Sequence, residues 1–333
     1  MIKKIKTIII AEAGVNHNGN IESAKKMVIA AASTGVDFIK FQKFSSENLV
    51  THYAKKPRYA ETKKKTSQLK MLRNLELSDS NFIQLKKLCN QKKIGFLVSG
   101  FDIESLNFLK KIKLNIFKIP SGEINNIPYL RHVGGFNKKI ILSTGMSNIN
   151  EIDLALNTLL SSGTKKNNIS LLHCNTDYPT AFRDANLNTI KELKEKFKVN
   201  VGFSDHTLGI EASLAAVALG ARVIEKHFTL NKNAAGPDHK ASLELKELEN
   251  LVKSIRNIEN AFGNKNKQVT KSEKKNIKFV RKSIVAKKNI AKGEIFSNIN
   301  ITTKRPATGK SPTLWDTILG KKAKKKYQKD QLI

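Results

Sequence analysis

The sequence of 333 residues predicts an α/β protein in which a (β/α)8 TIM barrel, a closed ring of eight parallel strands each followed by a helix, precedes a small second domain. Two observations favour the barrel. Short runs rich in β-branched residues alternate with segments whose apolar residues recur at helical spacing, which is the pattern of repeated βα units. Eight such units fit into roughly 260 residues, a length typical of this fold.

The eight candidate strands follow one another at intervals that leave room for a helix. Two of the intervening segments, residues 21–35 and 209–221, show the helical pattern clearly, and each closes with glycine as helices often do. The alternation therefore predicts parallel strands with helices between them. The candidate strands are residues 6–14, 36–42, 94–100, 115–123, 138–145, 169–174, 199–206 and 221–228.

The pattern changes after residue 263. Residues 264–278 are polar and lysine-rich and lack apolar periodicity, which predicts a linker with about one helical turn. We therefore divide the chain into a barrel at residues 1–263, the linker, and a small domain at residues 279–333.

The composition argues against a membrane-spanning or disulfide-stabilised protein. No run of about 18 apolar residues is present to span a bilayer. The apolar run at the N-terminus ends at Ala11, too early for a signal peptide, and predicts an opening strand instead. Cys89 and Cys174 cannot form a disulfide framework and lack the CxxC spacing of metal or redox motifs. We expect a cytoplasmic protein without a membrane partner.

The formal net charge of +32 raises the question of nucleic-acid binding. Only eight of the 60 basic residues are arginines, however, and the lysines are spread along the whole chain. Arginine is the usual reader of guanine edges and phosphates, so this pattern indicates solvated lysine-rich faces and no nucleic-acid partner. A non-catalytic nucleic-acid-binding protein remains the alternative of a different class.

Polar residues stand at the carboxyl ends of all eight predicted strands. Because these ends meet at one mouth of a barrel, where active sites are built, the side chains are expected to converge. Merely structural polar groups would each need a buried partner, so their recurrence favours a site. In chain order they are Glu12; Lys40 with Gln42; Ser99; Lys118 with Ser121 and Glu123; Ser143; His173 with Asn175; Ser204 with His206; and Glu225, Lys226 and His227.

These residue types suit three chemical tasks. Two ammonium groups with several hydroxyls suit a substrate that bears phosphate and carboxylate. Two imidazoles on neighbouring strands suit one catalytic Mn²⁺, Mg²⁺ or Zn²⁺ with open coordination positions. Carboxyl groups supply acid and base candidates. The set for phosphate and carboxylate is Lys40, Lys118, Ser99, Ser121, Ser143 and Ser204. The imidazoles are His206 and His227, and the carboxyl groups are Glu12, Glu123 and Glu225.

Eight motifs between Ile8 and Gly263 resemble, in order and spacing, the sialic acid synthase family. Members of that family condense phosphoenolpyruvate with an N-acylated mannosamine-type sugar. Short motifs are weak singly and strong as an ordered set. The motifs are EAGVNHNG (12–19), KFQ (40–42), KIPSGE (118–123), STGM (143–146), HCNTDYP (173–179), GFSDHTLG (202–209), EKHFTL (225–230) and GPDHKASLE (236–244).

The resemblance implies a role for each site residue. His206 and His227 would hold a divalent metal, with Mn²⁺ expected first, that acts as a Lewis acid on the sugar aldehyde. Tyr178 and Asp238 would hold the sugar. The catalytic set would be Glu12, Glu123, Lys118, His206 and His227, and the phosphoenolpyruvate-binding set Lys40, Gln42, Ser99, Lys118, Ser121, Ser143 and Ser204.

The resemblance extends to the small domain, which looks like the antifreeze-like SAF domain of the same family. There the domain of one subunit caps the barrel of its dimer partner and contributes an arginine from a KRPGTG-like motif. The matching segment here is KRPATG, so Arg305 is the expected sugar-binding residue. The resemblance therefore implies a domain-swapped homodimer.

The resemblance leaves the sugar open. N-acetylmannosamine, which gives N-acetylneuraminate, is the first expectation. N,N'-diacetyllegionaminate and pseudaminate synthases are the alternatives, because they use the same chemistry on deoxygenated diacetamido sugars. GPDHKASLE resembles the sialic and legionaminic types more than the pseudaminic type.

Overall fold

The computed structural model describes residues 6–55 and 67–333. The chain divides into two compact units, Met1–Phe262 and Gly263–Ile333. The first unit contains a closed barrel, and the second is a small domain with an apolar core of its own.

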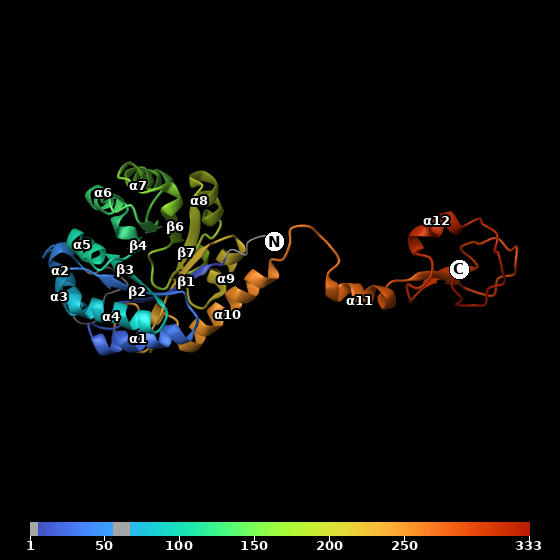
Figure 1. The fold of residues 1–333 in the computed structure, drawn as a ribbon, viewed down its shortest axis with the longest axis horizontal. Coiled ribbons are helices and arrows are strands. Elements are labelled where there is room, and N and C mark those ends of the chain that lie inside the picture. Colours follow the sequence, from blue (N-terminus) through green and yellow to red (C-terminus); the bar gives the residue numbers. More distant parts are fainter. Residues whose placement is uncertain (1–5, 56–66) are drawn as a thin grey trace. The chain divides into compact units, whose positions relative to one another are not determined.

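Eight parallel strands close into a ring in the order of the sequence, and the helices of this unit lie around it (Figure 1). The predicted (β/α)8 barrel is confirmed, and each predicted strand overlaps an observed one. On β1, for example, Glu12 pairs with Lys40 on one side and with His227 on the other. The strands are β1 (Ile8–Gly14), β2 (Phe38–Lys43), β3 (Gly95–Gly100), β4 (Ile116–Ile119), β5 (Lys139–Ser143), β6 (Ile169–Cys174), β7 (Asn200–Asp205) and β8 (Val223–His227).

The longer helices cover the strands because each turns an apolar stripe towards them. In α1 the buried residues Ala24, Met27, Val28 and Ala31 recur at helical spacing. The helices of this unit are α1 (Ile21–Ser33), α2 (Ser46–Leu49), α3 (Gln68–Arg73), α4 (Asp79–Gln91), α5 (Ile103–Lys111), α6 (Ile127–Gly134), α7 (Ile149–Ser161), α8 (Thr189–Phe197), α9 (Glu211–Ala218) and α10 (Leu245–Ala261).

The side chains that face the inside of the ring change from apolar to polar along the strands. Because side chains alternate between the two faces, residues two apart share a face. Glu12 thus follows Ile10, and Glu225 follows Val223, on the inner side. The inner apolar cluster comprises Ile10, Leu97, Ile141, Leu172 and Val223, with Ile8, Phe38 and Ile116 packed against it. This cluster fills the barrel below a polar mouth.

The second unit is built around two antiparallel strands, β9 (Ser283–Ala286) and β10 (Ile301–Lys304), and a short helix α12 (Trp315–Ile318). The predicted linker contains more helix than expected. Helix α11 (Lys271–Val280) has ten residues, and it begins at a capping box in which Thr270 and Glu273 satisfy each other's backbone amides. Prediction from apolar periodicity missed this helix because it buries no residue.

Within the described part of the chain, none of the helices combines the length and the apolar character needed to cross a membrane.

Candidate active site

A cavity of about 830 Å³ lies at the carboxyl ends of the barrel strands. Arg305, the predicted sugar-binding residue of the small domain, is exposed on the second unit, and its role stays a prediction. The cavity is lined by all the other residues to which the sequence assigned a chemical role, which are Glu12, Lys40, Gln42, Ser99, Lys118, Ser121, Glu123, Ser143, Tyr178, Ser204, His206, Glu225, His227 and Asp238.

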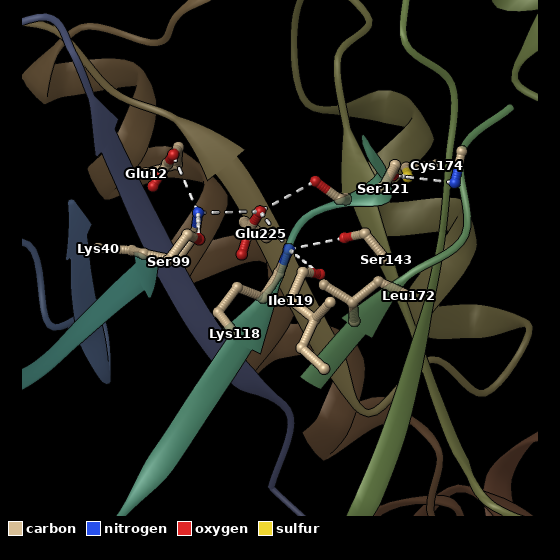
Figure 2. Close-up of polar contacts among 12 residues, drawn as sticks. Glu12, Lys40, Ser99, Lys118, Ile119, Ser121, Ser143, Leu172, Cys174 and Glu225 are labelled. Atoms are coloured by element: carbon tan, nitrogen blue, oxygen red, sulfur yellow. Dashed lines mark hydrogen bonds and ion pairs between the residues drawn. The ribbon is translucent and has the colours of Figure 1, made fainter. Parts of the chain in front are cut away.

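Two buried lysines share one carboxylate in this cavity (Figure 2). Glu225 Oε1 lies 3.6 Å from Lys40 Nζ and 3.7 Å from Lys118 Nζ. Lys40 Nζ also forms an ion pair of 2.9 Å with Glu12 Oε1. All four side chains are buried. Two lysines and two glutamates are thus held together with little exposure to solvent, so each charge must be compensated by the others.

Burial and the neighbouring charges set the pKa values of this cluster. Burial would lower the pKa of Lys40, but Glu12 and Glu225 outweigh it and the pKa is raised. For Lys118 burial prevails, and its pKa is lowered although Glu225 opposes the shift. Burial would raise the pKa of Glu225, yet the two lysines lower it. Lys118 is therefore the less compensated cation and gains more from an anionic ligand.

Serine hydroxyls lie beside both lysines. Ser99 Oγ accepts a hydrogen bond from Lys40 Nζ at 3.1 Å, and Ser143 Oγ accepts one from Lys118 Nζ at 2.7 Å. A hydroxyl that accepts from an ammonium group keeps its own proton free to donate. Each lysine therefore presents a charge and a neutral donor to the cavity together.

Two further serines complete this donor set. Ser121 Oγ accepts from the Gly145 amide at 3.0 Å and lies 3.3 Å from Cys174 Sγ. Ser204 Oγ donates to Glu225 Oε1 at 3.2 Å. The hydroxyls come from several strand ends around the ring, and Ser204 could donate to a bound anion only in place of its hydrogen bond to Glu225.

Of the three predicted acid and base candidates, Glu12 and Glu123 have raised pKa values, whereas that of Glu225 is lowered. Burial is the main cause for Glu12, whose ion pair with Lys40 opposes the shift, and for Glu123, whose hydrogen bond from Asn126 opposes it. Asn126 Nδ2 donates to Glu123 at 2.6 Å, and Gln42 Nε2 donates to Glu12 at 3.0 Å. Each carboxyl is thus held in place and kept closer to neutrality than in water, as proton transfer near pH 7 requires.

The two predicted metal ligands lie side by side, with ring centroids 5.4 Å apart. His206 Nδ1 donates to the Asn175 carbonyl oxygen at 2.5 Å, so Nε2 of a neutral ring keeps its lone pair for a ligand. Asn175 contributes this carbonyl rather than its side chain. Burial lowers the pKa of His206 to about 4 and that of His227 well below its ordinary value. Both imidazoles are therefore neutral at pH 7, the form that binds metal.

This arrangement fits a divalent cation held by two imidazoles. His227 Nδ1 is buried and makes no hydrogen bond to any residue that the structure describes. Asp238 Oδ2 lies 3.8 Å from that nitrogen. Across residues 6–55 and 67–333 no group of three His, Cys, Asp or Glu is arranged to hold a metal. A cation on His206 and His227 would therefore keep positions open for water and substrate, as catalytic metals do.

The predicted sugar-binding residues lie next to the imidazoles. The Tyr178 ring is 4.1 Å from the His206 ring, centroid to centroid, and meets the His227 ring edge-on at 5.6 Å. Burial, with a further contribution from Glu12, raises the pKa of Asp238 to about 7. A sugar bound between Tyr178 and Asp238 would meet one apolar face and one hydrogen-bonding carboxyl.

Hydrogen bonds from the loop after β1 fix the position of the loop after β8, which carries Asp238. Asn16 Nδ2 donates to Phe228 O and to Ser242 Oγ, both at 2.9 Å, and Ser242 Oγ donates to the Asp238 carbonyl at 2.7 Å. Gly14 has a φ of +52°, and a Cβ there would lie 3.2 Å from Asp238 Oδ2. Glycine is therefore needed for the chain to turn so close to the site.

The prediction that His173 and Lys226 face the mouth is wrong. His173 Nε2 donates to the Ala185 carbonyl at 2.8 Å, and Lys226 forms an ion pair with Asp205 on the outer side of the strands. Neither side chain lines the cavity. Because side chains alternate along a strand, only every second residue of a polar strand end reaches the mouth.

Sequence reasoning named Glu225 only as an acid or base candidate and did not foresee its pairing with both lysines, and it overlooked Cys174 at the cavity wall. The signal was available for Glu225, which lies two residues before His227 and so shares its face of β8. An apolar wall was also missed because its residues come from separate loops and from the short helices α2 and α3. It comprises Val15, Phe44, Leu49, Val50, Met71, Leu72, Leu75 and Phe101.

The chain is similar to known proteins over nearly its whole length. The NeuB family matches residues 27–267, and the SAF domain matches residues 281–333. An N,N'-diacetyllegionaminic acid synthase of Campylobacter jejuni subsp. jejuni serotype O:2 is 55% identical, over 98% of this chain and 99% of its own. A protein of the same name from Legionella pneumophila is 40% identical, over 94% of this chain and 89% of its own.

A solved structure agrees with these relatives. The crystal structure of N-acetylneuraminic acid (sialic acid) synthetase from Leptospira borgpetersenii serovar Hardjo-bovis, in complex with citrate, superposes with a TM-score of 0.73 at 35% sequence identity. The match covers 82% of this chain and 91% of that one.

Proposed function

The chain belongs to the NeuB family, and we propose that its substrates are phosphoenolpyruvate and 2,4-diacetamido-2,4,6-trideoxymannose, which give N,N'-diacetyllegionaminic acid and phosphate. It is a nonulosonic acid synthase, a transferase that condenses phosphoenolpyruvate with a sugar. One observation carries the assignment of the site: two buried lysines with serine hydroxyls share a cavity with two neutral imidazoles.

Phosphoenolpyruvate would bind at the lysine pair. Its phosphate and carboxylate suit ammonium groups that already have hydroxyl donors beside them. Lys118, the less compensated cation, would contribute most to neutralising the negative charge of the substrate. Gln42 and the hydroxyls fix the orientation of the enol; the hydroxyls are those of Ser99, Ser121, Ser143 and Ser204.

His206 and His227 would hold the divalent metal, which we propose is Mn²⁺. When bound, the metal supplies a Lewis acid that polarises the sugar aldehyde. The chain itself keeps the two rings neutral by burial and holds the tautomer of His206 through the Asn175 carbonyl. Tyr178 and Asp238 orient the sugar beside the rings.

The bond changes follow from the two substrates. Carbon 3 of phosphoenolpyruvate attacks the aldehyde carbon and forms the new carbon–carbon bond, which leaves positive charge on carbon 2. Water adds to carbon 2, and the tetrahedral adduct loses phosphate by cleavage of its carbon–oxygen bond. The aldehyde oxygen gains a proton and the attacking water loses protons. Glu12 and Glu123, both kept closer to neutrality by burial, are the carboxyls proposed to transfer them.

Two observations support the trideoxy sugar over N-acetylmannosamine. The relative that is 55% identical bears the name of a diacetyllegionaminic acid synthase. The cavity also has an apolar wall, formed by residues that include Phe44, Met71 and Phe101. A sugar with a methyl group at carbon 6 and a second acetyl group presents more apolar surface to such a wall than N-acetylmannosamine does.

We also propose that the enzyme acts as a homodimer in which Arg305 of one subunit reaches the sugar bound by its partner. The support is the SAF domain match at residues 281–333 together with the exposure of Arg305. A cytoplasmic location is proposed as well, consistent with two cysteines that are both free.

The test supplies purified protein with phosphoenolpyruvate and Mn²⁺, with N-acetylmannosamine in one reaction and 2,4-diacetamido-2,4,6-trideoxymannose in the other. Phosphate release and product mass are followed. We expect the higher kcat/KM with the trideoxy sugar. A preference for N-acetylmannosamine would make the protein a sialic acid synthase, and inactivity with both would reject the two sugars.

A further inference from the structure

A buried ion pair lies on the outer side of the strands that carry the two imidazoles. Lys226 Nζ is 3.0 Å from Asp205 Oδ2, and both side chains are 0% exposed. The two residues are partners in the pairing of β7 with β8. They immediately precede His206 and His227, so each end of the ion pair is one residue from a predicted metal ligand.

Charges are unexpected at these positions. The neighbouring outward-facing residues Phe203, Ile224 and Phe228 belong to the apolar core beneath the helices. Removal of an ion from water costs several kcal/mol, and well-packed apolar residues of similar volume are often as stabilising as a buried ion pair. Stability alone therefore gives little reason for two charges here, directly beside the site.

The pair holds the turn that follows His206. Asp205 Oδ1 accepts from both the amide and the hydroxyl of Thr207, at 2.8 Å each. Asp205 Oδ2 also accepts from Ser213 Oγ of α9 at 2.6 Å. Lys226 Nζ donates to the Thr207 carbonyl at 2.5 Å. The backbone after His206 is thus fixed to β8 and to α9 together.

We propose that Asp205 and Lys226 are positioning residues that fix the separation and orientation of the His206 and His227 rings, and thereby set the affinity of the metal site. The inference rests on the metal site proposed above. The two rings line the cavity, and each belongs to the residue that follows one member of the ion pair, just after the end of β7 and at the end of β8. Loss of the pair would let the two strand ends move independently.

The test measures Mn²⁺ affinity by the electron paramagnetic resonance signal of free Mn²⁺, without turnover. Lys226→Met keeps the length of the side chain and removes the charge. We expect its Kd for Mn²⁺ to rise about tenfold, as when the groups that orient metal ligands are lost. The matched control is Arg256→Ala, which breaks ion pairs with Asp37 and Glu259. It should lower Tm and leave the Mn²⁺ Kd within roughly twofold, because distant sites act independently.

Two milder variants keep the inference testable if Lys226→Met does not fold. Asp205→Asn removes the charge and retains an acceptor for Thr207, and Ser213→Ala removes only the hydrogen bond from α9. Both should weaken Mn²⁺ binding more than the control does. Unchanged Mn²⁺ affinity in variants with lowered Tm would show that the pair serves stability alone and would overturn the proposal.

Failure of the wild-type protein to bind Mn²⁺ would overturn both the metal site and this inference. The synthase function is judged separately, from product formation. A wild-type protein that binds Mn²⁺ tightly while making no product would reject the proposed reaction and leave the positioning role standing.

Discussion

Glu225 Oε1 lies 3.7 Å from Lys118 Nζ, one of the two lysines proposed to bind the anionic substrate. The same oxygen lies 3.6 Å from Lys40 Nζ. The carboxylate thus lies within ion-pair distance of both lysines. Phosphoenolpyruvate bound at the proposed place would therefore compete with Glu225 for the two lysines.

This competition predicts that removal of the Glu225 charge strengthens substrate binding. Glu225→Gln should lower the Kd for phosphoenolpyruvate about fivefold, since a unit charge at about 4 Å is worth about 1 kcal/mol even in a water-like dielectric. Lys118→Met should raise it at least about tenfold, because a charge-assisted contact is lost. Calorimetric titration with phosphoenolpyruvate alone measures both. Weaker binding by Glu225→Gln would mean that this carboxylate mainly orients the lysines.

The metal assignment predicts a selective effect of His206→Ala. Turnover should fall by about a thousandfold or more, because a Lewis acid contributes several kcal/mol to such a reaction. Phosphoenolpyruvate binding and the circular dichroism spectrum should stay close to those of the wild type, since the lysines and the core are untouched. Wild-type turnover in this variant would contradict the assignment of His206 as a metal ligand.

A buried histidine outside the metal pair predicts how stability depends on pH. Burial lowers the pKa of His17 to about 4, although a backbone hydrogen bond with Gly14 opposes the shift. Between pH 6.5, the ordinary pKa, and pH 4, His17 is protonated in the unfolded chain but stays neutral in the folded protein. The free energy of unfolding therefore decreases as the pH falls towards 4. The loss between pH 7 and pH 4 should be about 3 kcal/mol for this group.

Urea unfolding of the wild type and of His17→Gln at the two pH values measures this contribution. The variant should lose about 3 kcal/mol less than the wild type on acidification. His52→Gln, at an exposed histidine, is the control and should follow the wild type. Equal losses in all three proteins would show that His17 does not set the acid sensitivity.

The proposed role of Arg305 in the small domain predicts that its loss affects the KM for the sugar alone. Arg305→Ala should raise the KM for the sugar about tenfold, the effect of one lost charge-assisted hydrogen bond, and leave the KM for phosphoenolpyruvate unchanged. Lys310→Ala, at another exposed cation of the same unit, should change neither. An equal loss of both substrates in Arg305→Ala would argue against a role of this arginine at the sugar.

Much of the barrel was predictable because its strands obey a simple pattern. Apolar inner residues such as Ile10 and Val223 lead to polar ones two positions later, at Glu12 and Glu225. The same alternation, applied residue by residue, would have shown that Lys226 faces outward. The sequence alone gave no measure of which charges meet, because the contacts of Glu225 join residues far apart in the chain.

Helix α11 was not predicted, because apolar periodicity does not reveal a helix that buries no residue. Its residues lack an apolar stripe, and its start depends on the capping pair Thr270 and Glu273, which a search for apolar periodicity overlooks. The apolar wall of the cavity was missed for another reason. The fold assembles it from loops and two short helices, α2 and α3, that show no common pattern in the sequence.

The most direct test of the central claim uses phosphoenolpyruvate labelled with oxygen-18 in the oxygen that joins carbon 2 to phosphorus. The wild-type protein receives this substrate with Mn²⁺ and 2,4-diacetamido-2,4,6-trideoxymannose, and the released phosphate is analysed by mass spectrometry. Condensation with carbon–oxygen cleavage predicts phosphate that retains the label and forms only when the sugar is present. Unlabelled phosphate, or release that does not depend on the sugar, would contradict the account.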